Sequence, residues 1–366
     1  MSSAEAATST GKLLPLLRQR IRRDGPLRLD AYLRLCLSHP EHGYWHTAPA
    51  IGAGGDFITA PEISQAFGEI IGLWAAATWQ RLGQPTAMRL IELGPGRGTL
   101  MHDGLRAAAL VPKFLAAVSV HLIEISPALR QQQRQRLASL ATPAITWHAT
   151  LTDVPAGPAI VIGNEFLDAL PIRQLVFAAD GAWRERTVEL NAEAGLQFGL
   201  GEVVAFQGQP PPRPGDVAEI RSGEDELLEV LQRRQQPLLA LFIDYGPAEL
   251  GYGDSLQAVR RHAYVDPLSH PGEADLTAHV QFAAFANKAR AAGFVTHGPM
   301  PQAEFFGRLG MAERAARLMA ASPAWAQQIE TGVQRLLAPS GMGGRFKVLI
   351  VRSPQLATPE PFAQCA

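Results

Sequence analysis

The chain has few cysteines, little charge and no long apolar run, and each shortage excludes a class of protein. Only two cysteines occur among 366 residues, Cys36 and Cys365, which is too few for a disulfide framework and predicts a reducing compartment. Charged residues make up 18% and the net charge is −1, so bulk charge favours neither nucleic acid nor anionic lipid. Without an apolar run of about 18 residues, no transmembrane helix is predicted.

The middle of the chain alternates short apolar runs with helical segments, which predicts an open α/β sheet covered on both faces. One helix is expected from Thr99, and another from Pro127 behind a Ser126 cap. Most strands should be parallel, with the last one antiparallel. The expected strands are MRLIEL (88–93), VSVHLIEI (118–125), AITWHAT (144–150), PAIVIGNEF (158–166), PLLALFIDYG (237–246) and FKVLIV (346–351).

Two regions interrupt this alternation and set the predicted domain organisation. Residues 1–85 form a helical region with a lid over the site, and residues 171–235 form an antiparallel β insertion for substrate or partner binding. Residues 86–170 and 236–366 then make the core. The basic segment at 12–23 is also compatible with a mitochondrial presequence, but an apolar stripe favours an ordinary first helix; the stripe comprises Leu13, Leu16, Leu17 and Ile21.

The stretch IELGPGRGTL (91–100) places Gly94, Gly96 and Gly98 directly after an apolar strand. A glycine-rich bend between a strand and a helix is where open α/β sheets bind ligands. The spacing is G-x-G-x-G rather than the dinucleotide G-x-G-x-x-G, and Glu92 would repel a pyrophosphate while suiting a cation. We therefore predict that these residues bind S-adenosylmethionine, a sulfonium with a free amino group. A plain tight turn is the alternative.

A second acid, Glu124, ends the next strand. An acidic residue at that place in a nucleotide-type sheet hydrogen-bonds ribose hydroxyls, so Glu124 is expected to hold the cofactor's ribose. The alternative is a solvated carboxylate at a strand end.

The sequence resembles the MidA family, whose animal and fungal members are mitochondrial complex I assembly factors. The resemblance implies a class I Rossmann-like methyltransferase fold dependent on S-adenosylmethionine. It also implies methylation of a protein arginine, with a subunit of NADH:ubiquinone oxidoreductase as the eukaryotic substrate. One departure is Gln281, where an acid is expected. The segments that carry the resemblance are GDFITAPEISQAFGE (55–69), ELGPGRGTL (92–100), GNEFLDALP (163–171), DPLSHPGEADLTAHVQF (266–282) and MGGRFKVLI (342–350).

Arginine methylation requires carboxylates, because a protonated guanidinium has to be gripped and its charge drawn away from the attacking nitrogen. GNEFLDALP supplies Asn164, Glu165 and Asp168 at the end of the fourth strand, beside the predicted cofactor site. If the chain turns helical there, Glu165 and Asp168 face one cleft, and we predict that these two residues and Asn164 are catalytic. The alternative is that Asp168 caps a loop and Glu165 pairs with Arg173.

GDFITAPEIS is expected to form a lid, because Asp56 follows two glycines and Pro61 starts a helix. Asp56 and Thr59 would face the cofactor, and Glu62 would lie near the substrate. The alternative is a capped helix entry with no ligand role.

Four further residues are candidates for substrate binding. Asp244 and Tyr245 end the fifth strand at the same sheet edge, where structural burial is equally open. Asp275 and His279 lie in GEADLTAHV, where Asp275 also resembles the N-cap of a helix over 276–292.

No metal site is predicted. His39, His42 and His46 are spaced at i, i+3 and i+7, but Pro40 and Gly43 interrupt any helix, and no cysteine or paired acid completes a coordination shell.

The predicted function is thus a methyltransferase that uses S-adenosylmethionine and acts on a protein arginine. Two alternatives stay open: a methyltransferase acting on a small molecule or another side chain, and a non-catalytic assembly factor that retains the cofactor fold. The expected location is cytoplasmic in a bacterium and the mitochondrial matrix in a eukaryote.

Overall fold

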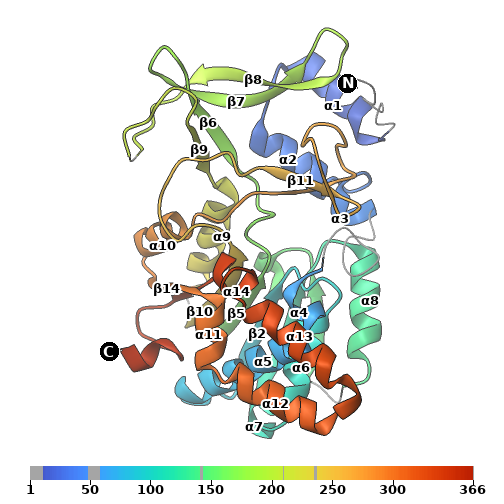
Figure 1. Cartoon of the computed structure of the whole chain (residues 1–366), viewed down its shortest axis with the longest axis vertical. Coiled ribbons are helices and arrows are strands. Elements are labelled where there is room, and N and C mark those ends of the chain that lie inside the picture. The colour runs from blue at the N-terminus through green and yellow to red at the C-terminus, as the bar shows by residue number, and fades with distance from the viewer. Residues whose placement is uncertain (1–10, 48–57, 141–142, 209, 235–236, 366) are drawn as a thin grey trace. The chain divides into compact units, whose positions relative to one another are not determined.

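The computed structural model describes residues 11–47, 58–140, 143–208, 210–234 and 237–365. The chain divides into two compact units, whose elements are labelled in Figure 1. The first unit consists of Met1–Phe57, Ala169–Gly223 and Gly251–Ala278, and the second of Ile58–Asp168, Glu224–Leu250 and His279–Ala366.

The second unit is built on a seven-stranded sheet with the order β14-β15-β10-β5-β2-β3-β4. The five strands from β10 to β4 are parallel, and β15 is antiparallel to both of its neighbours. All six predicted strands are confirmed, whereas β14 was not predicted because two prolines and a glycine interrupt its pattern. The strands are β2 (Met88–Leu93), β3 (Val118–Ile123), β4 (Ile145–His148), β5 (Ala159–Asn164), β10 (Leu238–Tyr245), β14 (Val295–Pro301) and β15 (Phe346–Arg352).

The strand order reverses at β2, because the chain leaves β4 at one edge and returns as β5 on the other side of β2. Open α/β sheets bind ligands at such a reversal, beyond the carboxyl ends of the strands. The fold therefore predicts a ligand-binding site at the carboxyl ends of β2 and β5.

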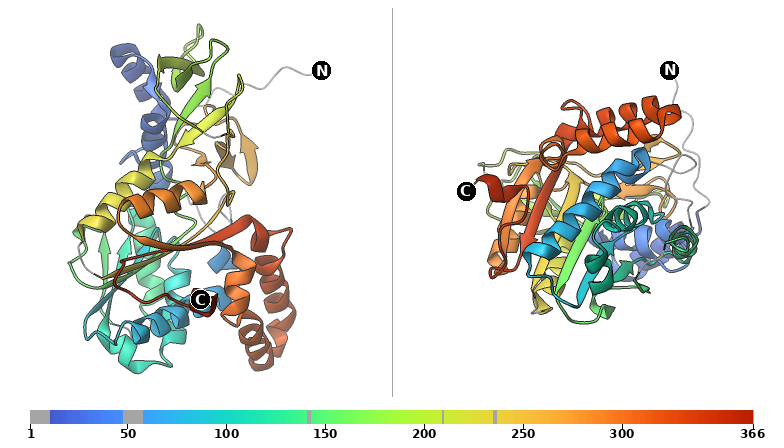
Figure 2. Two further views of the ribbon diagram at one scale, coloured as in Figure 1. Left: turned by 90° about the vertical axis from the view of Figure 1, so that its left-hand side faces the viewer. Right: turned by 90° about the horizontal axis from the view of Figure 1, so that it is seen from below.

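Helices cover both faces of this sheet, as Figure 2 shows. On one face Leu241 and Ile243 join a large apolar cluster with α5 and α6, and on the other the Phe242 ring packs against Phe285 of α10 at 5.2 Å between centroids. The helices assigned to this unit are α4 (Ala60–Ile63), α5 (Gln65–Arg81), α6 (Thr99–Ala108), α7 (Pro112–Ala117), α8 (Pro127–Leu137), α10 (Phe282–Ala291), α11 (Gln302–Arg308), α12 (Met311–Ala321), α13 (Ala326–Leu337) and α14 (Met342–Arg345).

Helices α5 and α6 cross closely because glycines face each other at the crossing. A methyl group added to Gly72 would lie 2.1 Å from the Gly104 carbonyl oxygen, and one added to Gly68 would lie 2.9 Å from the Leu100 oxygen. Beside the crossing, Glu69 is 1% exposed and pairs with two arginines. The crossing holds α6, and hence the glycine loop in front of it, against the sheet.

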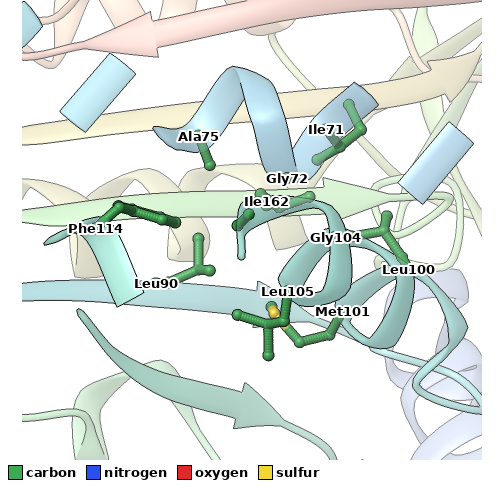
Figure 3. A pocket seen from close by; sticks show the side chains of 11 residues that line it. Ile71, Gly72, Ala75, Leu90, Leu100, Met101, Gly104, Leu105, Phe114 and Ile162 are labelled. Carbon is green, nitrogen blue, oxygen red and sulfur yellow. The ribbon is translucent and has the colours of Figure 1, made fainter. Parts of the chain in front are cut away.

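A small apolar hollow remains where these two helices meet the sheet. It is lined by Ile71 of α5, Leu105 of α6, Phe114 of α7, and Leu90 and Ile162 of the strands, as Figure 3 shows. These side chains offer no polar atom to a ligand, so the hollow is a packing feature rather than a binding site.

The first unit contains the antiparallel strands predicted within 171–235, but they end at Ile220, and Ser222–Arg233 is a helix. Its larger sheet has the order β1-β7-β6-β9, with β8 on β7, and a second sheet has the order β12-β11-β13. Leu13, Leu17 and Ile21 of α1 are buried as predicted, but Leu16 is 41% exposed. The elements are α1 (Leu13–Asp24), β1 (Leu27–Arg28), α2 (Leu29–Ser38), α3 (Tyr44–Thr47), β6 (Arg173–Phe177), β7 (Trp183–Leu190), β8 (Leu196–Val203), β9 (Val217–Ile220), β11 (Gln257–Arg260), β12 (Ala263–Val265) and β13 (Asp275–Thr277), followed by α9 (Ser222–Arg233), which begins here and continues in the second unit.

One helix prediction is wrong. Asp275 is not the N-cap of a helix that starts at Leu276, because Asp275–Thr277 is the strand β13, in which Asp275 pairs with Val259. The helix α10 begins only at Phe282. The pairing partner is distant in sequence, so local capping signals could not reveal it.

We expect Gly72→Ala to destabilise the protein by about 1–3 kcal/mol, the usual cost of overpacking, because its methyl group would overlap the Gly104 backbone. Gly307→Ala in α11 is the matched control, because a methyl group there meets no atom within 4 Å and replacing a helical glycine usually stabilises. Chemical denaturation of the two variants and the parent makes the measurement. Equal stability of Gly72→Ala and Gly307→Ala would contradict the close crossing.

Candidate active site

The glycine loop follows β2 and adopts backbone angles that favour glycine. The φ angles of Gly94, Gly96 and Gly98 are 61°, 53° and 78°. The Gly94 N–H donates to the Ile123 carbonyl at 3.0 Å, and the Gly98 N–H donates to the Pro95 carbonyl at 2.8 Å. Only glycine adopts three such left-handed conformations without strain, so the loop is a shaped turn that leads from β2 into α6.

Glu92 lies in β2 directly before this loop and is 3% exposed. Its Oε2 atom is buried without any hydrogen-bond partner. Burial raises the pKa of Glu92 to about 8, and repulsion by Glu124 adds to the rise. A buried carboxyl oxygen without a partner at the sheet's reversal point fits a ligand that carries a cationic donor, such as an ammonium group.

Glu124 follows β3 and is held by two donors. Its Oε1 accepts the Ser126 N–H at 2.8 Å, and its Oε2 accepts Nε2 of Gln133 at 3.2 Å. It is 6% exposed, so the solvated-carboxylate alternative is wrong. Burial raises the pKa of Glu124, and the backbone and side-chain hydrogen bonds oppose the rise. Contact with a ribose stays a prediction.

Gln133 in α8 joins three parts of the site and was missed by sequence reasoning. Its Nε2 also donates to the Gly96 carbonyl at 2.6 Å, and its Oε1 accepts the Trp147 indole N–H at 2.8 Å. The side chain is fully buried. No motif marks the position, because its partners lie in the glycine loop, in β4 and after β3, and only the fold brings them together.

At the end of β5, Asn164 and Glu165 lie next to the carboxyl end of β2. Glu165 has a φ of 50°, unusual for a non-glycine residue, and its Oε1 accepts the Ala60 N–H at 2.9 Å and Nδ2 of Asn164 at 3.2 Å. The Oδ1 atom of Asn164 is buried without a partner. Burial raises the pKa of Glu165 to about 7, while the Ala60 N–H lowers it and Asp168 raises it. The strained turn and the open acceptor indicate a functional position.

The chain does not turn helical after Asn164; it forms a turn that is held by Asp244. The Oδ2 atom of Asp244 accepts the N–H groups of Phe166, Leu167 and Asp168 at 3.1, 2.9 and 3.2 Å. Asp244 is fully buried; burial raises its pKa, Asp168 raises it further, and the N–H of Tyr245 opposes the rise. Asp244 therefore shapes the turn, and direct contact with substrate stays a prediction.

The alternative in which Glu165 pairs with Arg173 is wrong. Arg173 instead pairs with Glu185 on the neighbouring strand, with Nη2 and Oε2 2.5 Å apart. Asp168 is 7% exposed and lies close enough to Glu165 to raise its pKa, so the structure brings the two predicted catalytic carboxyls near one another.

The predicted helix start at Pro61 is confirmed as α4. Glu62 pairs with Arg97 of the glycine loop, with 3.1 Å between Oε2 and Nη1, and also hydrogen-bonds Thr99. This short helix is thus tied to the loop. Thr59 stands at its N-cap and uses no side-chain hydrogen bond there. Asp56 lies outside the described residues, and the cofactor role of both residues stays a prediction.

The other candidates are placed in different parts of the chain. The Tyr245 ring meets the His279 ring edge-on, 5.5 Å between centroids, within the second unit, whereas Asp275 belongs to the first unit. The rings of His39 and His42 stack. Within the described part of the chain, no three histidine, cysteine or acidic side chains are grouped to hold a metal ion, and no helix is long and apolar enough to cross a membrane.

Known proteins resemble this chain over most of its length. Residues 70–300 match the family described as "Putative S-adenosyl-L-methionine-dependent methyltransferase". A Drosophila melanogaster relative named protein arginine methyltransferase NDUFAF7 homolog, mitochondrial, is 36% identical over 95% of this chain and 86% of its own length. The human protein arginine methyltransferase NDUFAF7, mitochondrial, is 33% identical over 91% of this chain and 82% of its own length.

The fold also matches a solved structure. A Burkholderia thailandensis protein crystallised with S-adenosyl-homocysteine superposes with a TM-score of 0.83 and 26% identity, covering 100% of this chain and 97% of its own. The bound compound is what remains of S-adenosylmethionine after its methyl group has left. The glycine loop, Glu92 and Glu124 have the chemistry that this cofactor requires.

We expect Glu92→Gln to change how stability depends on pH. A raised folded-state pKa contributes stability that is fully present below about pH 4.5 and is lost as the pH rises through about 8. The neutral amide removes that loss. At pH 9 the cofactor-free variant should melt about 2 °C or more above the parent, which corresponds to about 1 kcal/mol. If the melting temperatures of parent and variant instead differ by the same amount at every pH from 6 to 9, the pKa of Glu92 is not raised by burial.

Gln133→Met should weaken cofactor binding about 10- to 100-fold, because Glu124 and the glycine loop lose a shared donor, and hydrogen bonds to a charged group contribute about 1.5–3 kcal/mol. Gln132→Met is the control, since Gln132 is the exposed neighbour in the same helix. Calorimetric titration with S-adenosylmethionine measures both. An equal affinity in the two variants would refute the role of Gln133.

Proposed function

Because the chain belongs to this family of S-adenosylmethionine-dependent methyltransferases, we propose that it methylates an arginine side chain of a protein. The names of the relatives support a protein arginine as the acceptor. The observation that carries the proposal is the turn after β5, in which Glu165 is strained and Asn164 keeps a buried acceptor atom without a partner.

The cofactor site in this proposal combines the glycine loop with two buried acids. Glu92 would accept a hydrogen bond from the amino group of the cofactor's methionine part. Glu124 would accept hydrogen bonds from the ribose hydroxyls, while the Gln133 side chain donates to the same Glu124 carboxylate. The cofactor supplies an electrophilic methyl group on a sulfonium centre. Most of the remaining catalysis is positioning and the exclusion of water, which a buried site at the end of β2 favours.

The acceptor site lies at the neighbouring strand end. Glu165 would hold the guanidinium of the substrate by charge-assisted hydrogen bonds, Asp168 would add a second negative charge, and the Oδ1 atom of Asn164 would accept one further N–H. Two carboxylates draw the positive charge toward themselves, which leaves the attacking nitrogen richer in electrons. A bound guanidinium would also offset the burial and the repulsion by Asp168 that raise the pKa of Glu165.

The partner we propose is a subunit of NADH:ubiquinone oxidoreductase, on the strength of the family resemblance. The relatives' names place those proteins in mitochondria. For a eukaryotic source we propose the mitochondrial matrix, and for a bacterial source the cytoplasm.

The deciding experiment is incubation of the purified protein with labelled S-adenosylmethionine and a lysate of its source. The expected result is a labelled protein band whose acid hydrolysate contains methylarginine. Label found in small molecules alone, or in another amino acid of a protein, would overturn the proposed acceptor while leaving the methyltransferase activity in place.

Glu165→Gln should lower turnover by roughly a hundredfold and leave cofactor affinity unchanged, because the substrate guanidinium loses its charge-assisted hydrogen bonds to the carboxylate. In the parent, kcat/KM should rise with pH through about 7, since the carboxyl is protonated and cannot grip the guanidinium below its pKa. The variant should lose that rise.

The matched control is Glu193→Gln, at an exposed glutamate of the first unit. Turnover at the parent level in Glu165→Gln would reject the catalytic role. A loss of cofactor affinity in that variant would instead move Glu165 into the cofactor site.

A further inference from the structure

Basic side chains gather on and beside the second unit's sheet. Arg89 in β2 stands beside Ser119 in β3, and His121 two residues further along β3 faces the same way. His148 ends the neighbouring β4. We name Arg89, His121, His148 and Arg234 the basic sheet face. About 16 Å of strand separates Arg89 from Gly94, so Arg89 lies at the far end of β2 from the glycine loop. The His148 carbonyl, at the end of β4, accepts the Glu124 N–H at 3.1 Å.

The two histidines form a polar pair. Nδ1 of His121 lies 3.0 Å from Nε2 of His148, and Nε2 of His121 lies 3.0 Å from the Ser119 hydroxyl. His121 is 5% exposed, and its pKa is lowered to about 4 by burial and then by His148, Arg89 and Arg234. Burial is thus the main cause of the low pKa of His121, and the neighbouring basic groups add to it.

Both arginines lie against the loop between β4 and β5, and both keep an unused donor. Arg234 donates through its Nη atoms to the carbonyls of Val154 and Pro155 at 3.3 and 2.9 Å, while its Nε is buried without a partner. The Arg89 guanidinium lies against Gly157, where an added methyl group would come within 2.7 Å of Cζ. Its Nε is also buried without a partner.

No carboxylate in the described part of the chain forms an ion pair with either arginine. Asp153 lies near His148 and raises its pKa, but one of its carboxyl oxygens accepts the Thr150 N–H at 3.1 Å. Two partly buried guanidinium groups beside each other repel, and burial together with Arg89 lowers the pKa of Arg234. Partly buried charges of one sign without an ion-pair partner attract a counter-charge.

We propose that the basic sheet face binds a small phosphate-type oxyanion. Two guanidinium groups neutralise a dianion, and their planar N–H forks match the oxygens of a phosphate. The unused Nε atoms of Arg89 and Arg234 supply donors that no protein group satisfies. S-adenosylmethionine carries no phosphate, so the ligand proposed for the two arginines differs from the cofactor, and the proposal does not rest on the proposed arginine substrate.

The test is a titration of the full chain with inorganic phosphate, exchanged against chloride at constant ionic strength and followed by calorimetry and melting temperature. The parent should bind phosphate and melt at a higher temperature in its presence. Arg89→Met should weaken phosphate binding about tenfold or more, because it removes charged hydrogen bonds. Without phosphate this variant should be at least as stable as the parent, since it relieves repulsion.

Arg233→Met is the matched control, because Arg233 is 74% exposed and pairs with Glu229. It should bind phosphate like the parent. An equal loss in Arg89→Met and Arg233→Met would reduce the effect to bulk charge and overturn the site. Arg234→Met decides the matter if Arg89→Met does not fold, and phosphate binding at the parent's affinity in Arg234→Met would overturn the proposal.

A second arm replaces inorganic phosphate with glycerol phosphate. Binding of the free ion alone would identify a site for inorganic phosphate. Binding of both would identify the phosphate group of a larger molecule as the ligand. Binding of neither would overturn the proposal. Two-dimensional NMR of the histidine rings gives an independent readout, because an anion between the arginines should shift the signals of His121 and His148.

Discussion

The rest of the site depends on buried carboxyl groups at the carboxyl ends of the parallel strands. Glu92, Glu124, Glu165 and Asp244 all lie at or near the carboxyl ends of parallel strands, and burial raises the pKa of each. Backbone N–H groups hold Glu124, Glu165 and Asp244, whereas Glu92 keeps an oxygen without a partner. Burying these carboxylates without a bound cation costs free energy. A sulfonium cofactor with an ammonium group, or a guanidinium, would offset that cost.

Steric constraints complement this electrostatic one. The glycines of α5 and α6 allow the helices to cross at backbone distance, and the glycines after β2 allow a turn that a side chain would strain. Gln133 then fixes the glycine loop to Glu124 through one buried amide. The loop is therefore positioned by packing from one side and by hydrogen bonds from the other, which is the kind of pre-organisation that methyl transfer requires.

The chain is a methyltransferase dependent on S-adenosylmethionine, and the same sheet that supports this activity has charges of opposite sign in different places. Acidic side chains lie at the carboxyl ends of the strands, and basic side chains lie around Arg89 and His121. Local fields of this kind are invisible in a net charge of −1. A balanced total charge excludes non-specific attraction to polyanions, and it says nothing about a site built from two or three side chains.

The sequence by itself determined the strands with continuous apolar runs, the glycine loop with its preceding acid, and the Ser126 cap of α8, because each depends on neighbours within a few residues. Local patterning could not predict β14, whose prolines and glycine hide a strand that forms only against β15. It also mistook Asp275 for a helix cap, since its partner Val259 lies in another strand. The roles of Gln133 and Asp244 were decided by the tertiary structure alone, because their hydrogen bonds join segments that are 37 and 78 residues apart.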